Sequence, residues 1–326
     1  MTINEITKLV EPMMDAYGER YRQITSSHIN IIESISTHLS HGQGKQLRPL
    51  LTFLTARCMG IGDAPAQCHT LYSVVVAIEM LHNSTLIHDD VVDESDTRRG
   101  IATVNSRWGN KVAVLYGDYM LAMVMKTINE LGNSSISSII NHTVLSMCQG
   151  ELLQQQCCNH YDTEPQTCLT IIEDKTACFM AACCQIGALC ATHDQAAIDR
   201  AQRFGLYLGM AFQLQDDMRD FLPTAATGKP QGNDVREHKA TLPIIYAMQD
   251  KEIGQELSSM MNRADFSNSD IEAIATLVRG SNGWLRCREL LDDYLSQAHN
   301  LLKQMPQNIY SQGLANILLY LKENQE

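Results

Sequence analysis

Two acidic pentads, far apart in the chain, are the groups in this sequence best suited to chemistry. Their carboxylates belong to Asp89, Asp90, Asp93, Asp216, Asp217 and Asp220. On a helix, residues four apart share a face, so each pentad places its carboxylates along one stripe. Like charges on a stripe repel, and near the C-terminal end of a helix they also oppose the helix dipole. The repeat therefore predicts that each stripe binds cations.

The donor atoms indicate which cation to expect. Carboxylate oxygens without neighbouring cysteine ligands are hard donors, which favours Mg²⁺. Mg²⁺ held by few carboxylates usually completes its shell with water and substrate phosphates. A single acidic pentad would be explained as a solvated helix face. Two matching pentads, each preceded by an apolar run, favour a site that binds Mg²⁺ with a phosphorylated substrate.

Polar and basic residues accompany both pentads. His82 and Thr85 share a helix face with Asp89, and Gln213 shares one with Asp217. Arg98 and Arg99 follow the first pentad, and further basic residues lie in other segments, at Lys45, Arg48, Lys175, Lys229 and Lys239. Arginine makes forked contacts with phosphate, and lysine supplies a point charge. In an acidic chain this set predicts two polyanionic ligands, one held partly by metal and one by side chains alone.

The overall composition narrows the class of protein. The 326 residues contain 25 Lys and Arg against 37 Asp and Glu, a formal net charge of −12, whereas a general nucleic-acid binder needs a basic face. The chain is 44% hydrophobic, which is enough for a sizeable core. It has 11 cysteines and no Cys-x-x-Cys spacing, so we expect free thiols and a cytoplasmic protein.

Helical periodicity dominates, and no segment shows convincing strand alternation. Long helices are expected at 69–93, 112–131, 136–158, 165–191 and 195–221. The sequence therefore predicts an all-α fold, organised as one domain over residues 1–326. Its core spans about 43–250, and a more variable helical tail covers 251–326. The polar stretch 222–239 is expected to form a loop over the site.

No targeting or membrane-spanning segment is expected. Charged residues at Glu5, Lys8 and Glu11 interrupt the N-terminus, which therefore lacks the apolar run of a signal peptide. No apolar run approaches the roughly 18–20 residues of a membrane span. The best candidate, Val74–Leu81, is short and contains Glu79.

Several motifs follow one another in order along the chain. They are Gly44-Lys45-x-x-Arg48-Pro49, His82, His88-Asp89-Asp90-Val91-Val92-Asp93-Glu94, Arg98-Arg99-Gly100, Lys175-Thr176-Ala177 and Phe212-Gln213-Leu214-x-Asp216-Asp217-x-x-Asp220. Together they resemble the trans-type polyprenyl diphosphate synthases, and most of all the bacterial octaprenyl diphosphate synthases of that family. The resemblance is strong over about residues 43–243 and weak elsewhere.

The resemblance implies a fold and a reaction. The fold is a single large helical bundle of the isoprenoid synthase type, with a central cavity between the two Asp-rich helices, in a homodimer. The reaction is a Mg²⁺-dependent prenyl transfer that condenses an allylic diphosphate, expected to be farnesyl diphosphate, with successive isopentenyl diphosphates. The product would be a long trans-polyprenyl diphosphate, first of all octaprenyl, for ubiquinone side chains.

The resemblance also implies a role for each matched residue. The six Asp residues of the pentads would bind Mg²⁺ ions that bridge to the allylic diphosphate. The residues implied to contact that diphosphate are Arg98, Lys175, Lys229 and Lys239, with Thr176 as a further substrate-binding residue. The residues implied to hold isopentenyl diphosphate are Lys45, Arg48, His82 and Arg99. Gln213 would line the reacting centre.

Two positions depart from the family pattern. Gln46 replaces the basic residue that commonly follows the first lysine. His238 stands where glycine often precedes the second lysine of the loop. Both departures leave the matched binding residues in place, so they concern the detail of the loops and not the reaction.

Product length is expected to depend on the helix that leads to the first pentad. Ser84 and Thr85 precede that pentad by about one turn, ~5–6 Å along the axis. In short-chain relatives bulky aromatic residues here stop the growing tail, so these small side chains predict a long product. Its end would then be set deeper, by Met120, Met123 or Met125. The alternative is that Ser84 and Thr85 only pack in a tight helix crossing.

Other functions stay open at this point. The alternative within the same reaction is a shorter, geranylgeranyl-type product. A class I terpene cyclase usually carries a mixed Asn/Ser/Glu motif on its second metal-binding helix, which this chain lacks. A non-catalytic subunit of a two-component synthase would be expected to have lost an acidic cluster. A calcium-binding structural protein would need a glycine-centred loop. Besides the two diphosphates and a second copy of the chain, we expect peripheral membrane contact during product release and no nucleic-acid partner.

Overall fold

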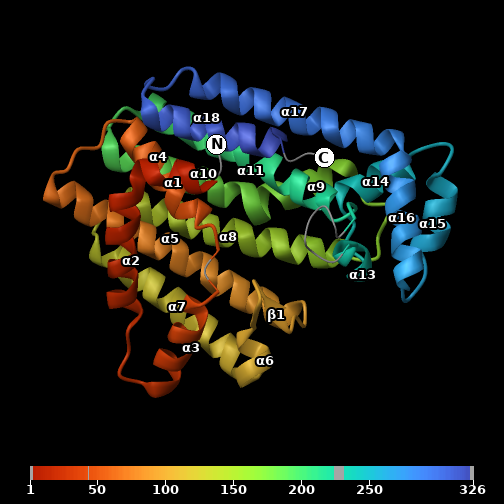
Figure 1. Ribbon diagram of the computed structural model, residues 1–326, viewed down its shortest axis with the longest axis horizontal. Helices are drawn as coiled ribbons and strands as arrows, with labels where there is room; N and C mark the ends of the chain where they lie inside the picture. The colour runs from red at the N-terminus through yellow and green to blue at the C-terminus, as the bar shows by residue number, and fades with distance from the viewer. Residues whose placement is uncertain (1–2, 43, 224–230, 324–326) are drawn as a thin grey trace. The chain divides into compact units, whose positions relative to one another are not determined.

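The computed structural model describes residues 3–42, 44–223 and 231–323, and most of this part of the chain is helical (Figure 1). The predicted all-α fold is confirmed. The helices up to residue 130 are α1 (Ile3–Thr7), η1 (Lys8–Val10), α2 (Glu11–Thr25), α3 (Asn30–Ser40), α4 (Leu47–Cys58), α5 (Pro65–Val92), α6 (Val104–Trp108) and α7 (Asn110–Glu130). Those that follow are α8 (Ser134–Cys157), α9 (Pro165–Ile172), η2 (Glu173–Ala177), α10 (Cys178–Ala191), α11 (Gln195–Arg219), α13 (Asn233–Arg236), α14 (Leu242–Met248), α15 (Gly254–Met261), α16 (Asn268–Gly280), α17 (Asn282–Leu302) and α18 (Ile309–Glu323).

The chain forms two compact units, each assembled from segments that are distant in sequence. Unit 1 comprises Met1–Ile139, Cys183–Asp199 and Met305–Asn316. Unit 2 comprises Ile140–Ala182, Arg200–Gln304 and Ile317–Glu326. The first pentad belongs to unit 1 and the second to unit 2. The single domain over 1–326, and a cavity between the two Asp-rich helices, stay predictions.

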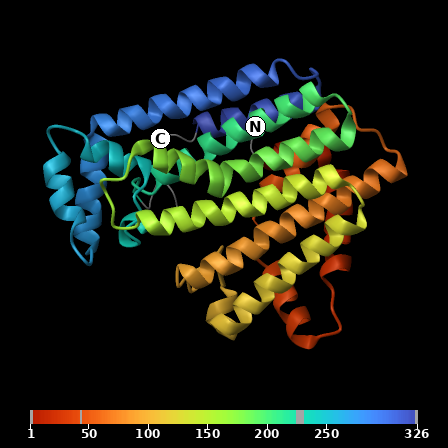
Figure 2. The same ribbon diagram turned by 180° about the vertical axis from the view of Figure 1, so that it is seen from behind.

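Helix α5 carries the first pentad through the core of unit 1. Its β-branched run Val74–Val76 is fully buried, so packing outweighs the weak helix propensity of valine. Helix α5 lies beside α7 in both views (Figures 1 and 2). Where they cross, a Cβ at Gly117 would lie 2.2 Å from His88 Nε2. Any larger residue at position 117 would therefore require the His88 ring to move.

Helix α5 also meets the length and composition of a membrane span over Cys68–Val92. However, 67% of its most apolar window is buried inside the protein, as in the core helix of a globular domain. Of the residues described, no other helix meets this criterion.

One small sheet occurs in unit 1, although strand alternation predicts none. Strands β1 (Thr97–Arg98) and β2 (Ile101–Ala102) pair antiparallel, with Arg98 opposite Ile101. The turn between them has φ values of +52° at Arg99 and +80° at Gly100. Positive φ at both positions is the pattern of the type I′ turn that closes two-residue hairpins. The hairpin directly follows the first pentad and carries its two arginines.

The helix expected at 165–191 contains a change of winding. Helices α9 and α10 are joined without a break by η2 (Glu173–Ala177), which is wound as a π-helix. Such segments are rare and frequently occur at functional sites. The stretch predicted as a loop, 222–239, contains the short helix α13, and Lys229 lies outside the residues that the structure describes.

Candidate active site

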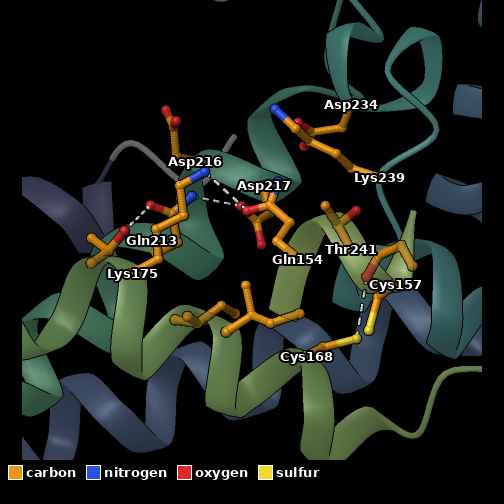
Figure 3. Close-up of a pocket in the computed structure, with 14 residues that line it drawn as sticks. Gln154, Cys157, Cys168, Lys175, Gln213, Asp216, Asp217, Asp234, Lys239 and Thr241 are labelled. Carbon is orange, nitrogen blue, oxygen red and sulfur yellow. Dashed lines mark hydrogen bonds between the residues drawn. The ribbon is translucent and has the colours of Figure 1, made fainter. Parts of the chain in front are cut away.

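Unit 2 contains a pocket of about 200 Å³ at the C-terminal end of α11 (Figure 3). Its polar lining consists of Gln154, Lys175, Thr176, Gln213, Asp216, Asp217, Asp234, Lys239 and Thr241. Its apolar lining consists of Cys157, Cys168, Ile171, Ile172 and Ala240. The structure thus brings together Lys175, Thr176, Gln213, Asp216, Asp217 and Lys239 from the sequence prediction.

The π-helical segment η2 places two of these residues in the pocket wall. Lys175 and Thr176 are neighbours in η2, and both line the pocket. Glycines on the adjacent helices let η2 pack closely: a Cβ at Gly150 would lie 2.7 Å from the backbone nitrogen of Lys175, and one at Gly209 2.6 Å from Ala177 Cα. These distances leave no room for a side chain, so both helices contact the backbone of η2 directly.

A chain of hydrogen bonds connects η2 with the second pentad. Thr176 Oγ1 donates to Gln213 Oε1 over 2.8 Å, and Gln213 Nε2 donates to Asp217 Oδ1 over 2.7 Å (Figure 3). Each amide end of Gln213 is therefore used, which sets the orientation of its side chain. Gln213 holds the Asp217 carboxylate in one position at the pocket wall.

The second pentad is short of positive charge. Burial first, and then the neighbouring carboxylates of Asp216 and Asp220, raise the pKa of Asp217 to about 7. Lys175 acts in the opposite direction without cancelling this effect. Asp216 is exposed, whereas Asp217 is buried. A carboxylate cluster in this condition gains stability when a cation binds.

Asp220 has a different environment from the other two acids of its pentad. Its Oδ1 accepts from the backbone N–H of Asn233 and its Oδ2 from that of Asp234, each over 3.0 Å. Asp220 thereby fixes the start of α13 beside the end of α11. The carboxyl group of Asp234 itself lines the pocket, where burial and the charges of Asp220 and Asp217 raise its pKa well above the usual range.

Three polar residues of this pocket, Gln154, Asp234 and Thr241, are missing from the sequence prediction, and so is Glu151, which does not line the pocket. Asp234 lies in a stretch assigned only as loop. Glu151 forms an ion pair with Lys175, and Gln154 Oε1 accepts from Lys175 Nζ over 3.0 Å. Burial alone would raise the pKa of Glu151, but the Lys175 charge holds it below the usual range. The signal in the sequence is the i, i+3 spacing of Glu151 and Gln154, which puts both on one face of α8.

The second loop lysine follows a strained residue. Lys239 lines the pocket and pairs with Glu237. Its backbone N–H donates to the carbonyl of Asp234 over 2.8 Å. The residue before it, His238, has φ +53°, a backbone conformation that favours glycine.

In unit 1, the first pentad lies at the C-terminal end of α5. Asp89 and Asp93 are half-buried and Asp90 is buried. Arg98 Nε donates to Asp90 Oδ1 over 2.6 Å, an ion pair that spans from the hairpin to the helix. Burial raises the pKa of Asp90, while Arg98 lowers it and Asp93 raises it.

The second arginine of the hairpin, Arg99, lies against the loop at Gly44. A Cβ at Gly44 would lie 2.4 Å from the Arg99 guanidinium carbon, so Arg99 packs on the bare backbone of Gly44. The next residue in that loop, Lys45, is exposed. The turn thus directs Arg98 to the acidic cluster and Arg99 to the loop that carries Lys45.

Arg48 and His82 make direct contact in unit 1. Arg48 Nη1 and His82 Nε2 are 3.2 Å apart. Burial lowers the pKa of His82 well below its usual range, and the charges of Arg48, Arg99 and Arg98 lower it further. The ring is therefore neutral; since arginine only donates, His82 Nε2 accepts and Nδ1 carries the proton. Together with Arg99, these groups form a cationic site.

A buried acid, Glu79, lies one turn before His82 on α5. Its side chain is 6% exposed, and burial raises its pKa, against the opposing charges of Arg48 and Arg99. Its Oε2 has no hydrogen-bond partner in the described part of the protein. Sequence patterns assign no role to this residue, because a single glutamate in an apolar run has no distinctive spacing.

The two residues proposed to control product length differ in their surroundings. Ser84 is buried and its Oγ donates to the carbonyl of Gly117 over 2.9 Å. Thr85 is half-buried and donates to the carbonyl of His82 over 2.9 Å. Ser84 therefore packs in the tight crossing of α5 and α7. Of the three deeper methionines, Met120 is buried and Met125 is exposed.

The fit of these residues to Mg²⁺ rests on their donor atoms and charge. Within 3–42, 44–223 and 231–323, no three His, Cys, Asp or Glu side chains are gathered so that they would hold a metal ion by themselves. The second pentad nevertheless offers only oxygen donors, and its raised pKa values show an unmet need for positive charge. Such a set suits Mg²⁺, which takes few protein ligands and completes its shell from water and phosphate.

Comparison with known proteins identifies the family. Residues 29–278 match the family model described as polyprenyl synthetase. A heptaprenyl diphosphate synthase component 2 from Geobacillus stearothermophilus is 32% identical over 322 residues, 98% of this chain and 98% of that protein. An octaprenyl diphosphate synthase from Haemophilus influenzae is 36% identical over 250 residues, 76% of this chain and 74% of that protein.

Solved structures agree with these matches. The crystal structure of a polyprenyl synthase from Caulobacter crescentus, complexed with calcium and isoprenyl diphosphate, has a TM-score of 0.90 at 30% identity and covers 98% of this chain and 97% of that chain. The chain therefore belongs to the polyprenyl synthetase family. It is an enzyme, a prenyltransferase of the trans-polyprenyl diphosphate synthase type.

Proposed function

We propose that this enzyme elongates farnesyl diphosphate with successive isopentenyl diphosphates, head to tail and trans, and that octaprenyl diphosphate is its main product. The observation that carries the proposal is that the chain has two distinct sites suited to diphosphates. One, in unit 2, combines acids with lysines, whereas the other, in unit 1, presents Arg48, His82 and Arg99. A relative from Haemophilus influenzae carries the octaprenyl name.

The acid-rich site is proposed to bind the allylic diphosphate. Mg²⁺ bound there would act as a Lewis acid that neutralises the charge on the departing diphosphate. Lys175 and Lys239 supply fixed positive charge to the same oxygens, which stabilises the charge that develops as the C–O bond breaks. Gln213 and Thr176 hold Asp217 in position. Arg98, paired with Asp90, is proposed to add a forked contact.

The arginine site is proposed to hold isopentenyl diphosphate by its diphosphate end. Arg48 and Arg99 donate to the phosphate oxygens, and the Nδ1–H of neutral His82 is a further donor. The bound isopentenyl double bond then attacks the allylic carbocation, and loss of a proton restores an alkene. The chain needs no side-chain nucleophile for this sequence of steps, and the released diphosphate is the proposed base.

One assay tests the function directly. The purified enzyme is incubated with farnesyl diphosphate and labelled isopentenyl diphosphate, with and without Mg²⁺, and the dephosphorylated products are sized. We expect products of about eight isoprene units that require Mg²⁺. Products that stop at four units would favour the geranylgeranyl-type alternative. Cyclic hydrocarbons formed without isopentenyl diphosphate would favour a terpene cyclase.

Close packing around η2 leads to a first mutational prediction. A methyl group in Gly150→Ala would meet the Lys175 backbone, which must then shift. Since a displacement of about 1 Å in a positioning element can cost up to 100-fold in rate, we expect kcat/KM for the allylic diphosphate to fall by about tenfold. Gly18→Ala is the control, because no atom lies within 4 Å of its Cβ. Steady-state kinetics of both variants measure the effect. If kcat/KM for the allylic diphosphate is the same in Gly150→Ala as in Gly18→Ala, the contact of Gly150 with η2 has no role in positioning Lys175.

Product length is predicted to respond at Thr85. Each isoprene unit adds five carbons, whose burial contributes up to about 4 kcal/mol, so the tail fills whatever space is open. In Thr85→Phe we expect shorter products with turnover retained. Ser84→Phe must also displace α7 at Gly117, so we expect lower thermal stability in that variant. An unchanged product distribution in a folded, active Thr85→Phe enzyme would contradict control of product length by Thr85. Packing at the helix crossing would then be the remaining explanation of the small side chains.

A homodimer is the proposed assembly. Apolar side chains are exposed on α7 of unit 1, namely Val114, Leu115 and Met125, and exposed apolar groups of this kind often mark subunit contacts. The relative named as component 2 of a heptaprenyl synthase raises the alternative of a different partner chain. Sedimentation of the active enzyme tests this: we expect twice the chain mass, and activity only after addition of another protein would contradict the proposal.

The cellular setting is also part of the proposal. The described cysteines are all free thiols, which supports a cytoplasmic enzyme. An octaprenyl product would serve quinone side chains, ubiquinone included. Because the product is strongly apolar, its release is proposed to involve peripheral contact with a membrane.

A further inference from the structure

His238 occupies a strained backbone position beside the pocket. Its φ of +53° lies in the left-handed region, which a residue with a Cβ adopts at a cost. Glycine would fit this position without strain. A histidine here needs compensating contacts, and the structure shows where they are made.

Both ring nitrogens of His238 have a partner. Nε2 lies 3.2 Å from the carbonyl oxygen of Ala264, which can only accept, so Nε2 carries the proton. Nδ1 lies 3.2 Å from the hydroxyl oxygen of Tyr161, with which it forms the second hydrogen bond. The ring centre lies 5.0 Å from that of Phe266. The position and the plane of the imidazole are therefore set by three contacts.

The backbone of His238 adds two further bonds. Its carbonyl accepts from the N–H of Asn159 over 3.0 Å, and its N–H donates to the carbonyl of Val235 over 3.0 Å. These bonds connect the turn after α8 with the end of α13, while the ring reaches the segment before α16. Three segments of unit 2 thus meet at one residue, immediately before Lys239.

We propose that His238 is a positioning residue for the allylic diphosphate, which it serves by fixing the backbone from which the Lys239 ammonium reaches the pocket. The inference rests on the proposed function of that pocket. His238 itself does not line the pocket, whereas Lys239 does, with a side chain only 14% exposed. A lysine held by a fixed backbone loses less freedom when the ligand binds, and this preorganisation increases affinity.

The test separates the ring from the backbone strain. His238→Gly relieves the strain and removes the ring; His238→Asn tolerates the same φ with a smaller side chain. For His238→Gly we expect the KM of farnesyl diphosphate to rise by about tenfold, with kcat and the KM of isopentenyl diphosphate within twofold. His238→Asn should lie between this variant and the parent. Tyr161→Phe should reproduce part of the effect, and add nothing in the His238→Gly background.

A matched control lies on the neighbouring turn. Asn159 also has a positive φ, +64°, and bonds to His238 through its backbone only. Asn159→Gly therefore relaxes strain in the same contact region without touching the ring, and its KM values should equal those of the parent. A similar rise in the farnesyl diphosphate KM in this variant would show that the loop is merely sensitive to glycine.

Binding distinguishes this inference from the function on which it rests. Calorimetric titration with inorganic diphosphate and Mg²⁺ should show about tenfold weaker binding to His238→Gly than to the parent. One outcome is that the parent binds diphosphate about tenfold more tightly than His238→Gly and yet makes no polyprenyl product. In that case the proposed function fails and the role of His238 stands. If the parent is active and His238→Gly or His238→Asn binds and turns over equally well, the role of His238 is wrong. A loss of thermal stability in both variants with unchanged KM values would likewise overturn it.

Discussion

In Asp217→Asn we expect kcat to fall by about 10³-fold, with the fold of the protein intact. Asparagine keeps the shape of the side chain and still accepts the hydrogen bond from Gln213, so the change removes little besides the charge. Asp217 is buried beside two further carboxylates, where its negative charge is costly without a cation. Loss of that charge removes the reason for Mg²⁺ to bind, and with it the stabilisation of the leaving diphosphate. Single-turnover rates at saturating Mg²⁺ measure the effect.

The same helix provides a matched control. Gln195 donates to Asp199 over 2.7 Å, the same i, i+4 pair as Gln213 and Asp217, at the exposed start of α11. Asp199→Asn should keep activity within twofold. Near-normal turnover of Asp217→Asn would remove the assignment of the second pentad to metal and diphosphate.

Metal-free protein provides a second readout besides activity. Because the folded-state pKa of Asp217 is raised to about 7, this group destabilises the folded protein increasingly as pH rises above about 4, and fully above 7. In the presence of a chelator, Asp217→Asn should therefore have a higher Tm than the parent at pH 8, and the difference should disappear near pH 4. Addition of Mg²⁺ and diphosphate should raise the Tm of the parent and leave that of the variant unchanged.

The long helices and the six pentad acids are readily predicted from the sequence. Helix α5 has no glycine across 65–92, and its apolar residues recur at helical spacing, so only its ends differ from the expected 69–93. The pentads stand out because acids at i, i+1 and i+4 behind an apolar run rarely occur twice by chance. Local spacing is enough for both inferences.

The contacts that arrange the site depend on residues far apart in the chain. The π-helical turn at Lys175 forms where Gly150 of α8 and Gly209 of α11 press on η2, and no pattern within 173–177 marks it. The hairpin at Arg98 has strands of two residues, too short for any alternation to appear. Asp234 lines the pocket at the start of α13, where Asp220 accepts hydrogen bonds from the backbone of Asn233 and Asp234, residues 13 and 14 positions further along the chain. Tertiary packing determines these features, and such packing cannot be inferred from the sequence of a single segment.

Arg48→Ala is predicted to separate the two substrates. We expect the KM of isopentenyl diphosphate to rise by about 100-fold, equivalent to about 2.7 kcal/mol, a typical loss when a charged hydrogen-bonding group is removed. The KM of farnesyl diphosphate should change by less than threefold, because the residues of the unit 2 pocket are unaltered. Arg48 also contacts His82, so part of the loss comes from a ring that is no longer held in position.

Helix α4 contains a second arginine that serves as the control. Arg57 donates to Asp63 over 2.6 Å and to the carbonyl of Ile61 over 3.2 Å, contacts that stabilise the end of α4 and involve none of the proposed substrate-binding residues. Arg57→Ala should lower Tm and leave the ratio of the two KM values unchanged. Initial rates with each substrate varied in turn measure that ratio. An equal rise of both KM values in Arg48→Ala, or a rise for farnesyl diphosphate alone, would mean that Arg48 does not hold isopentenyl diphosphate. A side chain that contacts only one of the two substrates must change the KM of that substrate more than the KM of the other.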